Sequence, residues 1–210
     1  MAESSRPDPL VIRKLEFIGG MATADGWRPS TDLPEVAFAG RSNVGKSSLL
    51  NRLVRRKAFA RVSKTPGRTR EINFFRVNDK FILSDLPGYG YARVSKEKKA
   101  DWKPLIEGYL RRTQTLAGVV QLLDIRREPS EDDVSMLDYL AELEVPTVVV
   151  LTKTDKLSRS AAEARTQGIM RALSLSREQT ISFSATSGEG RDELAEAVAS
   201  LVGSASGAAG

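Results

Sequence analysis

A short loop between an apolar segment and a helix-like segment constrains this chain more than any other feature. Residues 40–48 read GRSNVGKSS and match the spacing G-x-x-x-x-G-K-[ST] without exception. The mostly apolar run before it, residues 35–39, has the length of a buried strand, and leucine and valine recur at helical spacing after it. A strand that turns through such a loop into a helix presents unpaired backbone N–H groups to an anion. The sequence therefore predicts a phosphate-binding loop.

The side chains of this loop indicate a nucleotide bound together with Mg²⁺. Lys46 is placed to meet the terminal phosphates and takes a catalytic role, and the hydroxyl of Ser47 is placed to bind the metal. The glycines let the backbone approach the phosphate oxygens closely. We expect the whole loop to contact the nucleotide, through Gly40, Arg41, Ser42, Asn43, Val44, Gly45, Lys46, Ser47 and Ser48.

The rest of the chain alternates apolar segments of strand length with amphipathic segments of helix length. Such alternation is typical of a mainly parallel sheet covered by helices on both faces. Segments 72–77 and 80–85 are separated only by Asn78-Asp79, which predicts an antiparallel hairpin. Ser130 and Asp133 resemble a capping box at the start of a later helix.

The two ends of the chain differ from its middle in composition. Residues 1–9 are polar and contain two prolines, and residues 203–210 hold only glycine, alanine and serine. We therefore expect disordered tails around a single domain that covers residues 10–202. Within that domain, residues 10–33 form an N-terminal extension with an added edge strand, which Gly19-Gly20 is expected to end.

The composition narrows the chemistry that the chain can perform. It contains no cysteine and no histidine, which excludes thiol or imidazole catalysis, disulfides and zinc sites of the usual ligand types. No apolar run reaches the roughly 20 residues that span a bilayer, so we expect a cytoplasmic protein without a membrane span. The formal charge of +5 is compatible with an acidic partner such as RNA, although charge alone decides little.

A second motif, Asp85-Leu86-Pro87-Gly88, follows the hairpin at the carboxyl end of a strand, where open α/β sheets bind ligands. The carboxylate of Asp85 could hold Mg²⁺ through water. The N–H of Gly88 could touch a terminal phosphate, so Gly88 is assigned a catalytic role. Considered alone, Asp-x-x-Gly is a common turn, and it indicates a nucleotide site only in combination with the other motifs.

A third motif, Thr152-Lys153-Thr154-Asp155, follows an apolar strand and indicates which base is bound. Asp155 can accept hydrogen bonds from the N1–H and the 2-amino group of guanine, whereas adenine lacks that pair of donors. The stem of Lys153 can lie along the base, and the backbone of Ser184-Ala185-Thr186 could meet guanine O6. Considered alone, the third motif also fits a charged turn that caps a helix. In this company it predicts GTP rather than ATP.

In this order and at strand ends, the motifs resemble the Ras-like fold of translation-factor-class GTPases. Five stretches narrow the resemblance: GRSNVGKSSLLN at 40–51, KTPGRT at 64–69, INFF at 72–75, DLPGYGYA at 85–92 and TKTD at 152–155. Together they resemble the bacterial EngB (YihA/YsxC) family over nearly the whole chain. The most discriminating features are DLPGYGYA and the threonine that opens TKTD.

This resemblance implies both a fold and a role. The implied fold is a Ras-like P-loop GTPase with three α/β/α layers and a mainly parallel sheet of about six strands plus one antiparallel strand. The implied role is that of a protein that binds GTP and GDP, is needed for normal cell division and septation, and is linked to assembly of the large ribosomal subunit. A large-subunit precursor and its rRNA are the implied partners, and we expect a monomer.

The resemblance also adds site residues from the segment that follows the first helix. Thr69 is implied to bind Mg²⁺ and to sense the γ-phosphate, which gives it a catalytic role, and Thr65 is a nearby rival. Further nucleotide contacts are expected from Gly67, Arg68, Thr69, Arg70 and Glu71, and from Phe183, Ser184 and Ala185 at the other end of the site.

Tyr89 leaves a gap in the hydrolytic chemistry. Ras-type enzymes carry a glutamine there that orients the attacking water, and an aromatic ring cannot do so. Intrinsic hydrolysis is therefore expected to be slow, on the order of 10⁻³ s⁻¹ or less. Asn43 occupies the position at which related potassium-stimulated GTPases bind K⁺, so K⁺ could replace an arginine finger. An asparagine that only tightens the loop is the alternative.

Basic residues gather between Arg52 and Arg76. This stretch holds nine positive side chains and the single acid Glu71, a local excess of +8 that exceeds the +5 of the whole chain. Such clusters bind phosphate backbones without reading sequence, so the cluster favours a contact with rRNA. A solvated basic face is the alternative.

Two other functions compete with a GTP-hydrolysing switch. Tyr89 also fits a GTP-dependent binding module whose hydrolysis is incidental. A division-site scaffold that acts through protein contacts is the second alternative, although no segment of the sequence is dedicated to such contacts.

Overall fold

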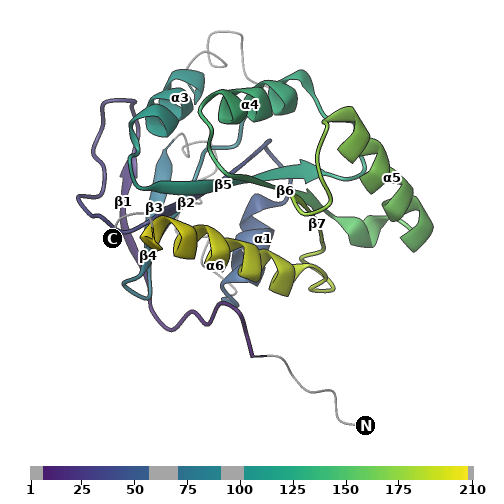
Figure 1. Cartoon of the computed structure of the whole chain (residues 1–210), viewed down its shortest axis with the longest axis horizontal. Coiled ribbons are helices and arrows are strands. Elements are labelled where there is room, and N and C mark those ends of the chain that lie inside the picture. Colours follow the sequence, from purple (N-terminus) through teal and green to yellow (C-terminus); the bar gives the residue numbers. More distant parts are fainter. Residues whose placement is uncertain (1–6, 57–70, 91–101, 208–210) are drawn as a thin grey trace.

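The computed structural model describes residues 7–56, 71–90 and 102–207, and they form a seven-stranded sheet with helices on both faces (Figure 1). No helix in these three segments is both long and apolar enough to cross a membrane. In chain order the elements are β1 (Leu15–Met21), β2 (Glu35–Gly40), α1 (Lys46–Leu53), β3 (Ile72–Val77), β4 (Phe81–Asp85), α3 (Trp102–Arg112), β5 (Leu116–Asp124), α4 (Glu131–Glu142), β6 (Thr147–Thr152), the 3₁₀ helix η2 (Thr154–Lys156), α5 (Arg159–Ala172), β7 (Thr180–Phe183) and α6 (Arg191–Gly207).

The strands follow the order β1-β3-β4-β2-β5-β6-β7 across the sheet. β3 is antiparallel to both of its neighbours, and each of the other neighbouring pairs in the described sheet is parallel. The predicted Ras-like α/β fold, with a mainly parallel sheet and one opposed strand, is thus confirmed. The predicted hairpin is confirmed as well, because Val77 pairs with Phe81 and both Asn78 and Asp79 adopt the positive φ of a tight hairpin turn.

Successive side chains of the central strands face opposite helical layers. In β5, Val120 and Leu122 belong to the core beneath α1 and α6, whereas Val119 belongs to the core beneath α3 and α4. Figure 1 shows these helix pairs on the two faces of the sheet, with α5 at the end formed by β6 and β7. Gln121 has the same parity as Val119, so its fully buried amide lies in the α3 and α4 layer.

The edge strand in the N-terminal extension is present, but Gly19-Gly20 does not end it. β1 continues through both glycines to Met21, with an irregular register between Phe17 and Gly19. Gly19 has φ 150°, and a Cβ at this position would lie 2.4 Å from the ring of Trp27. Glycine is therefore needed here because an aromatic ring lies on the strand, and not because the strand stops.

The C-terminal end also differs from the prediction, because α6 continues through Gly207. Residues 203–207 are thus helical, and of the predicted tail residues 208–210 fall outside the described part of the chain. Val202 and Ala205 pack against the core beneath the sheet, which explains why a segment of small residues continues the helix. Composition suggested a tail because small side chains bury little surface and glycine and serine are weak helix formers, so the packing of Val202 and Ala205 and not propensity explains the helix here.

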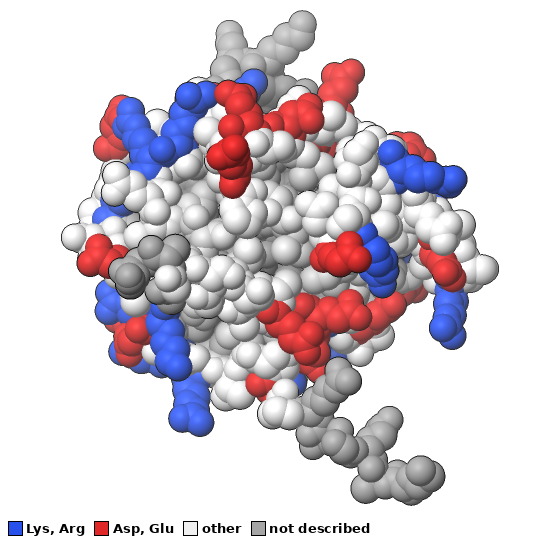
Figure 2. Space-filling model, in the orientation of Figure 1, with Lys and Arg blue, Asp and Glu red and all other residues white. Residues whose placement is uncertain are grey.

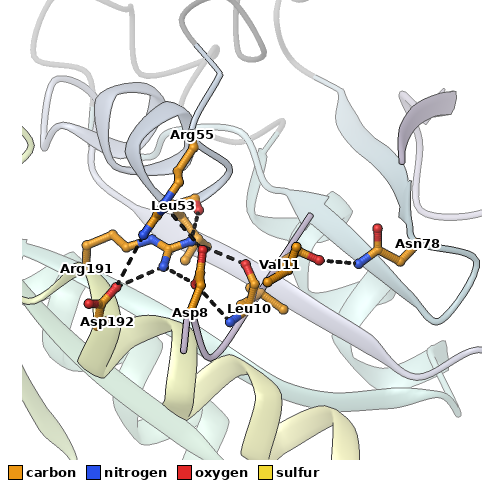
Figure 3. A network of polar contacts seen from close by, with 8 residues as sticks. All are labelled: Asp8, Leu10, Val11, Leu53, Arg55, Asn78, Arg191 and Asp192. Carbon is orange, nitrogen blue, oxygen red and sulfur yellow. Dashed lines mark hydrogen bonds and ion pairs between the residues drawn. The ribbon is translucent and has the colours of Figure 1, made fainter. Parts of the chain in front are cut away.

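The predicted N-terminal tail is wrong for its last residues, because Asp8 is bonded to the folded domain (Figure 3). The guanidinium of Arg191, which is only 5% exposed, donates to Asp8, to the carbonyl oxygen of Leu10 at 3.3 Å and to that of Leu53 at 3.0 Å. Partial burial opposes ionisation of Asp8, but the bond from Arg191 holds its pKa below the ordinary value. The ion pair between Arg191 and Asp8 is therefore weakened only when acid protonates the carboxyl of Asp8.

Specific contacts fix the ends of two helices. α4 begins with the expected capping box, in which Ser130 and Asp133 each accept a backbone N–H of the other. α1 ends at Leu53, because Arg55 turns to φ 52° and Arg191 donates to the last carbonyl of the helix. Arg191 thus joins the end of α1 to the start of α6.

Replacement of Arg191 by methionine should lower the free energy of unfolding by about 2–4 kcal/mol. Methionine keeps an apolar stem, but the carboxylate of Asp8 and two carbonyl oxygens lose their common donor. Arg55→Met is the matched control, because the Arg55 side chain is 62% exposed and its ion pair with Asp8 should contribute at most about 1 kcal/mol. Urea unfolding followed by circular dichroism measures both. Equal stability of the two variants would contradict the assigned role of Arg191.

Candidate functional site

Four of the sequence motifs lie at one edge of the sheet. The phosphate-binding loop follows β2, the motif of Asp85 ends β4, Thr152 ends β6, and Ser184 follows β7. Because β2, β4, β6 and β7 run in the same direction, their carboxyl ends meet at this edge. The fold thereby brings together segments that are more than 140 residues apart in the chain.

The phosphate-binding loop carries the backbone geometry that its glycines predict. Gly45 has φ 109° and stands immediately before α1, so the first N–H groups of that helix face outwards from the loop. Gly40 allows a close approach of β5, since a Cβ there would lie 3.0 Å from atoms of Leu122 and Val44. Asn43, at φ 65°, is the other left-handed residue of the loop.

A cleft of about 580 Å³ opens above this loop, and we call it the phosphate cleft. At its floor the ammonium of Lys46 forms an ion pair with the carboxylate of Asp85, and both side chains are largely buried. Val44 and Leu86 are buried, so their side chains serve the core. The cleft is lined by Arg41, Ser42, Asn43, Gly45, Lys46, Ser47, Ser48, Glu71, Asn73, Asp85, Leu86, Pro87, Gly88 and Lys153.

The oxygen donors of this cleft fit Mg²⁺. The hydroxyl of Ser47 and the carboxylate of Asp85 line one space, and Mg²⁺ prefers a few such ligands supplemented by water and substrate phosphates. Within the described residues, no group of three or more acidic side chains could hold a metal alone. A nucleotide would thus have to complete the coordination. The predicted metal ligand Thr69 lies outside the described residues, as do Thr65, Gly67, Arg68 and Arg70.

The segment that contains Gly88 lies directly against the phosphate-binding loop. The N–H of Ser42 donates to the carbonyl of Tyr89 at 2.8 Å, and the hydroxyl of Ser42 donates to the carbonyl of Gly88 at 3.1 Å. A Cβ on Gly88 would lie only 3.0–3.2 Å from three atoms of Ser42. Glycine is therefore required for this contact between the two motifs.

The motif at the end of β6 is fastened to the same loop. The hydroxyl of Thr152 donates to the carbonyl of Val44 at 2.7 Å, and the ammonium of Lys153 donates to the carbonyl of Asn43 at 2.7 Å. Lys153 also contacts the carboxylate of Asp124 at 2.8 Å. The threonine that opens TKTD therefore has a structural role, because its hydroxyl holds the phosphate-binding loop in place.

Asp155 is oriented at the far end of the site. The hydroxyl of Ser184 donates to Asp155 Oδ1 at 2.8 Å, and the ammonium of Lys156 lies 3.1 Å from Oδ2. The bond from Ser184, with a further contribution from Lys156, lowers the pKa of Asp155, so the group is a carboxylate at neutral pH. An oriented carboxylate of this kind can accept two hydrogen bonds from guanine.

The segment after β7 contributes less to the site than the sequence suggests. The N–H of Ser184 donates to the carbonyl of Glu189, and the N–H of Thr186 donates to the hydroxyl of Ser184. Ala185 alone in this triplet has an N–H without a partner among the described residues. The side chain of Phe183 is buried in the core beneath α1 and α6, so it does not line the cleft.

Two acidic residues of the site are missing from the sequence prediction. Asp124 holds Lys153 and Arg126 at the end of β5; burial opposes its ionisation, but these two hydrogen bonds hold its pKa well below the ordinary range. Glu189 accepts the hydroxyl of Thr154 at 2.6 Å. The only signal for Asp124 was its place at the carboxyl end of a strand, and no signal pointed to Glu189.

Tyr89 does not face the phosphate cleft. Its side chain is fully buried in the core beneath α3 and α4, and its hydroxyl donates to the carboxylate of Asp133 at 2.9 Å. The expectation that this residue does not orient water therefore agrees with its position.

Comparisons with known proteins agree with this geometry. Residues 35–153 match the family described as 50S ribosome-binding GTPase. A relative from Gemmatimonas aurantiaca, named probable GTP-binding protein EngB, is 62% identical over 193 residues, which are 92% of this chain and 95% of the relative. A relative of the same name from Syntrophomonas wolfei is 50% identical over 92% of this chain and 99% of its own length.

A solved structure supports the same assignment. The crystal structure of a probable GTP-binding protein engB superposes with a TM-score of 0.68 at 26% identity, and the match covers 80% of this chain and 98% of that one. The fold, the motifs and the extent of the sequence identity all point to one group of proteins. The chain belongs to the EngB family of P-loop GTPases.

Proposed function

We propose that this protein is a GTP-controlled switch that acts in the cytoplasm on assembly of the large ribosomal subunit, and that normal cell division depends on it. The observation that carries the proposal is the Asp155 carboxylate, which Ser184 orients at one end of a site whose other end is the phosphate cleft. Asp155 selects guanine, Lys46 binds the terminal phosphates, and Ser47 contributes to Mg²⁺ binding. The metal supplies charge neutralisation at the transferred phosphoryl group.

Replacement of Asp155 by asparagine should weaken GTP binding about 100-fold or more, because two hydrogen bonds to a charged acceptor are lost. The amide instead matches xanthine, so the affinity for xanthosine triphosphate should rise. Competition titrations with both nucleotides measure the change. Asp138→Asn is the matched control, since Asp138 is an exposed carboxylate on α4. Unchanged GTP affinity of the Asp155 variant would refute the assignment of the base site.

Hydrolysis is proposed to be slow and to be completed by K⁺ or by a partner. Tyr89 is buried, so it contributes no water-orienting group. Asn43 is exposed and lines the phosphate cleft, which suits a K⁺ ligand. Its φ of 65° also suits an asparagine that only shapes the loop, because asparagine tolerates this conformation better than most residues.

The hydrolysis rate in NaCl should be on the order of 10⁻³ s⁻¹ or below and should rise at least about tenfold in KCl. Asn43→Ala should lose this rise while its GDP affinity stays close to that of the wild type. Single-turnover kinetics in the two salts, with and without large-subunit precursors, measure both effects. Equal rates in all conditions would contradict the proposed role of K⁺ and would favour a binding module with incidental hydrolysis.

The proposed rRNA contact is supported by a groove of about 820 Å³ between α1 and the segment before α6, which we call the basic groove. Four arginines line it, and Asp192 is the single acid among its lining residues. The face of the molecule shown in Figure 2 has no such excess of one charge, because positive and negative side chains are interspersed around a largely uncharged centre. The arginines of the groove are Arg52, Arg55, Arg56 and Arg191.

The first three of these arginines belong to the basic stretch between Arg52 and Arg76. They are exposed, although each guanidinium group also contacts the protein. Arg52 donates to the carbonyl of Ser187 at 3.1 Å and Arg56 to that of Arg13 at 3.0 Å, and Arg55 forms exposed ion pairs with Asp8 and Asp192. Five further basic residues of the stretch lie outside the described residues. An exposed cluster of arginines in a groove fits the phosphates of an RNA backbone.

The double replacement of Arg52 and Arg55 by glutamine should weaken binding to large-subunit rRNA and reduce the salt slope, d log K/d log [salt], by about 1–2 units. Arg159→Gln with Arg171→Gln on α5 removes the same charge elsewhere and is the matched control. Filter binding at several salt concentrations, with GDP and with a non-hydrolysable GTP analogue, measures the effect. Equal binding by both double variants would count against rRNA docking in the basic groove, as would binding that does not depend on salt or on the nucleotide. A division scaffold would then be the function to test, by localisation of the protein in cells.

A further inference from the structure

The phenol of Tyr89 forms a buried polar link between two other elements. It donates to Asp133 Oδ1 at 2.9 Å, and it accepts a hydrogen bond from the side-chain amide of Gln121 in β5. Burial, together with the nearby Asp133, raises the pKa of Tyr89 well above its usual range, so the hydroxyl remains a donor. The side chain is therefore held at both its donor and its acceptor site.

Asp133 is in turn fixed by the start of α4. Its other oxygen, Oδ2, accepts the N–H of Ser130 at 2.9 Å and the hydroxyl of Ser130 at 2.7 Å. Asp133 is only 4% exposed, and Gln121 is fully buried. Tyr89 is thus attached to a helix terminus and to a central strand, both of which are rigid parts of the fold.

The backbone of the same segment is attached to the phosphate-binding loop. Ser42 donates to the carbonyls of both Gly88 and Tyr89, and the backbones of Arg41 and Tyr89 form an isolated parallel β-bridge. The chain then turns at Gly90, whose φ of 68° lies in the left-handed region that favours glycine. The segment of Gly88 and Tyr89 is therefore held from the loop on one side and from α4 on the other.

We propose that Tyr89 is a positioning residue that presents the N–H of Gly88 to the γ-phosphate. The proposal rests on the GTP binding proposed above, in which Gly88 touches the terminal phosphate. The phenol takes no part in the chemistry; it fixes the residue next to the donor. Because only GTP carries the third phosphate, this preorganisation strengthens binding of GTP and leaves binding of GDP almost unchanged.

Tyr109 provides a matched control within the same core. Like Tyr89 it is fully buried in the core beneath α3 and α4, and its hydroxyl donates to a buried carboxylate, that of Glu35. Tyr109 lies in α3, and the hydrogen bond of its hydroxyl among the described residues goes to Glu35 in β2 and not to the phosphate-binding loop. Removal of either hydroxyl leaves a buried carboxylate short of one donor, and Tyr89→Phe also leaves the amide of Gln121 without its acceptor, so the Tyr89 variant should lose the more stability of the two.

The test compares the affinities of Tyr89→Phe and Tyr109→Phe for GDP and for a non-hydrolysable GTP analogue by isothermal titration calorimetry. Tyr89→Phe should weaken analogue binding about three- to tenfold, the loss expected for one disordered hydrogen bond, and change GDP binding less than twofold. Tyr109→Phe should keep the wild-type ratio of the two affinities. Equal ratios in both variants, or a Tyr89 variant that binds the analogue as well as the wild type, would overturn the proposal.

A second pair of variants separates positioning from stability. Asp133→Ala removes the acceptor of the phenol without changing the sequence of the segment of Gly88, and it should shift the affinity ratio in the same direction. Ser130→Ala removes a hydroxyl of the capping box but keeps the contact between Tyr89 and Asp133, so it should lower the melting temperature alone. A ratio that Asp133→Ala leaves unchanged would also overturn the proposal. A wild-type protein that binds neither nucleotide would instead refute the proposed GTP site.

Discussion

The phosphate-binding loop keeps its shape because side chains from the end of β6 are bonded to its carbonyl oxygens. A loop with left-handed backbone at Asn43 and Gly45 has no regular hydrogen-bond ladder of its own. Thr152 and Lys153 supply the missing donors, at 2.7 Å each, from a strand more than 100 residues later in the chain. The loop therefore depends on the correct order of the parallel strands, and the site forms only when the sheet does.

The charged groups of the site are arranged as ion pairs that a nucleotide can rearrange. Lys46 is paired with Asp85, and Lys153 with Asp124. In the proposed GTP-bound form the second pair would persist, because it fixes the stem of Lys153 at the proposed base site. The first pair would be broken, because phosphate would compete for Lys46 and would leave the carboxylate of Asp85 available to Mg²⁺. Phosphate binding would thus be coupled directly to the segment that contains Gly88.

Patterns in the sequence predict the sheet and its motifs well because both depend on local signals. Apolar periodicity, the tight turn at Asn78-Asp79 and the capping box of Ser130 each act over a few residues, and the structure contains all three. Two of the predictions that failed concern the ends of the chain. The attachment of Asp8 depends on Arg191, which lies 183 residues away, and no local pattern encodes that contact. The helical end of α6 likewise depends on a tertiary surface that receives Ala205.

The candidate site shows the same division between local and distant information. The spacing of the motifs predicts Lys46, Ser47 and Asp155, because each belongs to a short pattern with a chemical reason. Asp124 and Glu189 stand outside such patterns, and they matter only because the fold places them beside Lys153 and Thr154.

The sequence predicts correctly that Tyr89 supplies no water-orienting amide, but it does not predict the hydrogen bonds that the phenol forms in the core. A tyrosine at position 89 indicates only that this residue has no amide group to orient the attacking water. In the fold, the phenol satisfies Gln121 and Asp133 in a core where unpaired polar groups would be costly. A glutamine that turned towards the cleft would leave both of these groups without their partner. The architecture beneath α4 therefore favours the tyrosine, and the means of activating water must come from outside this position.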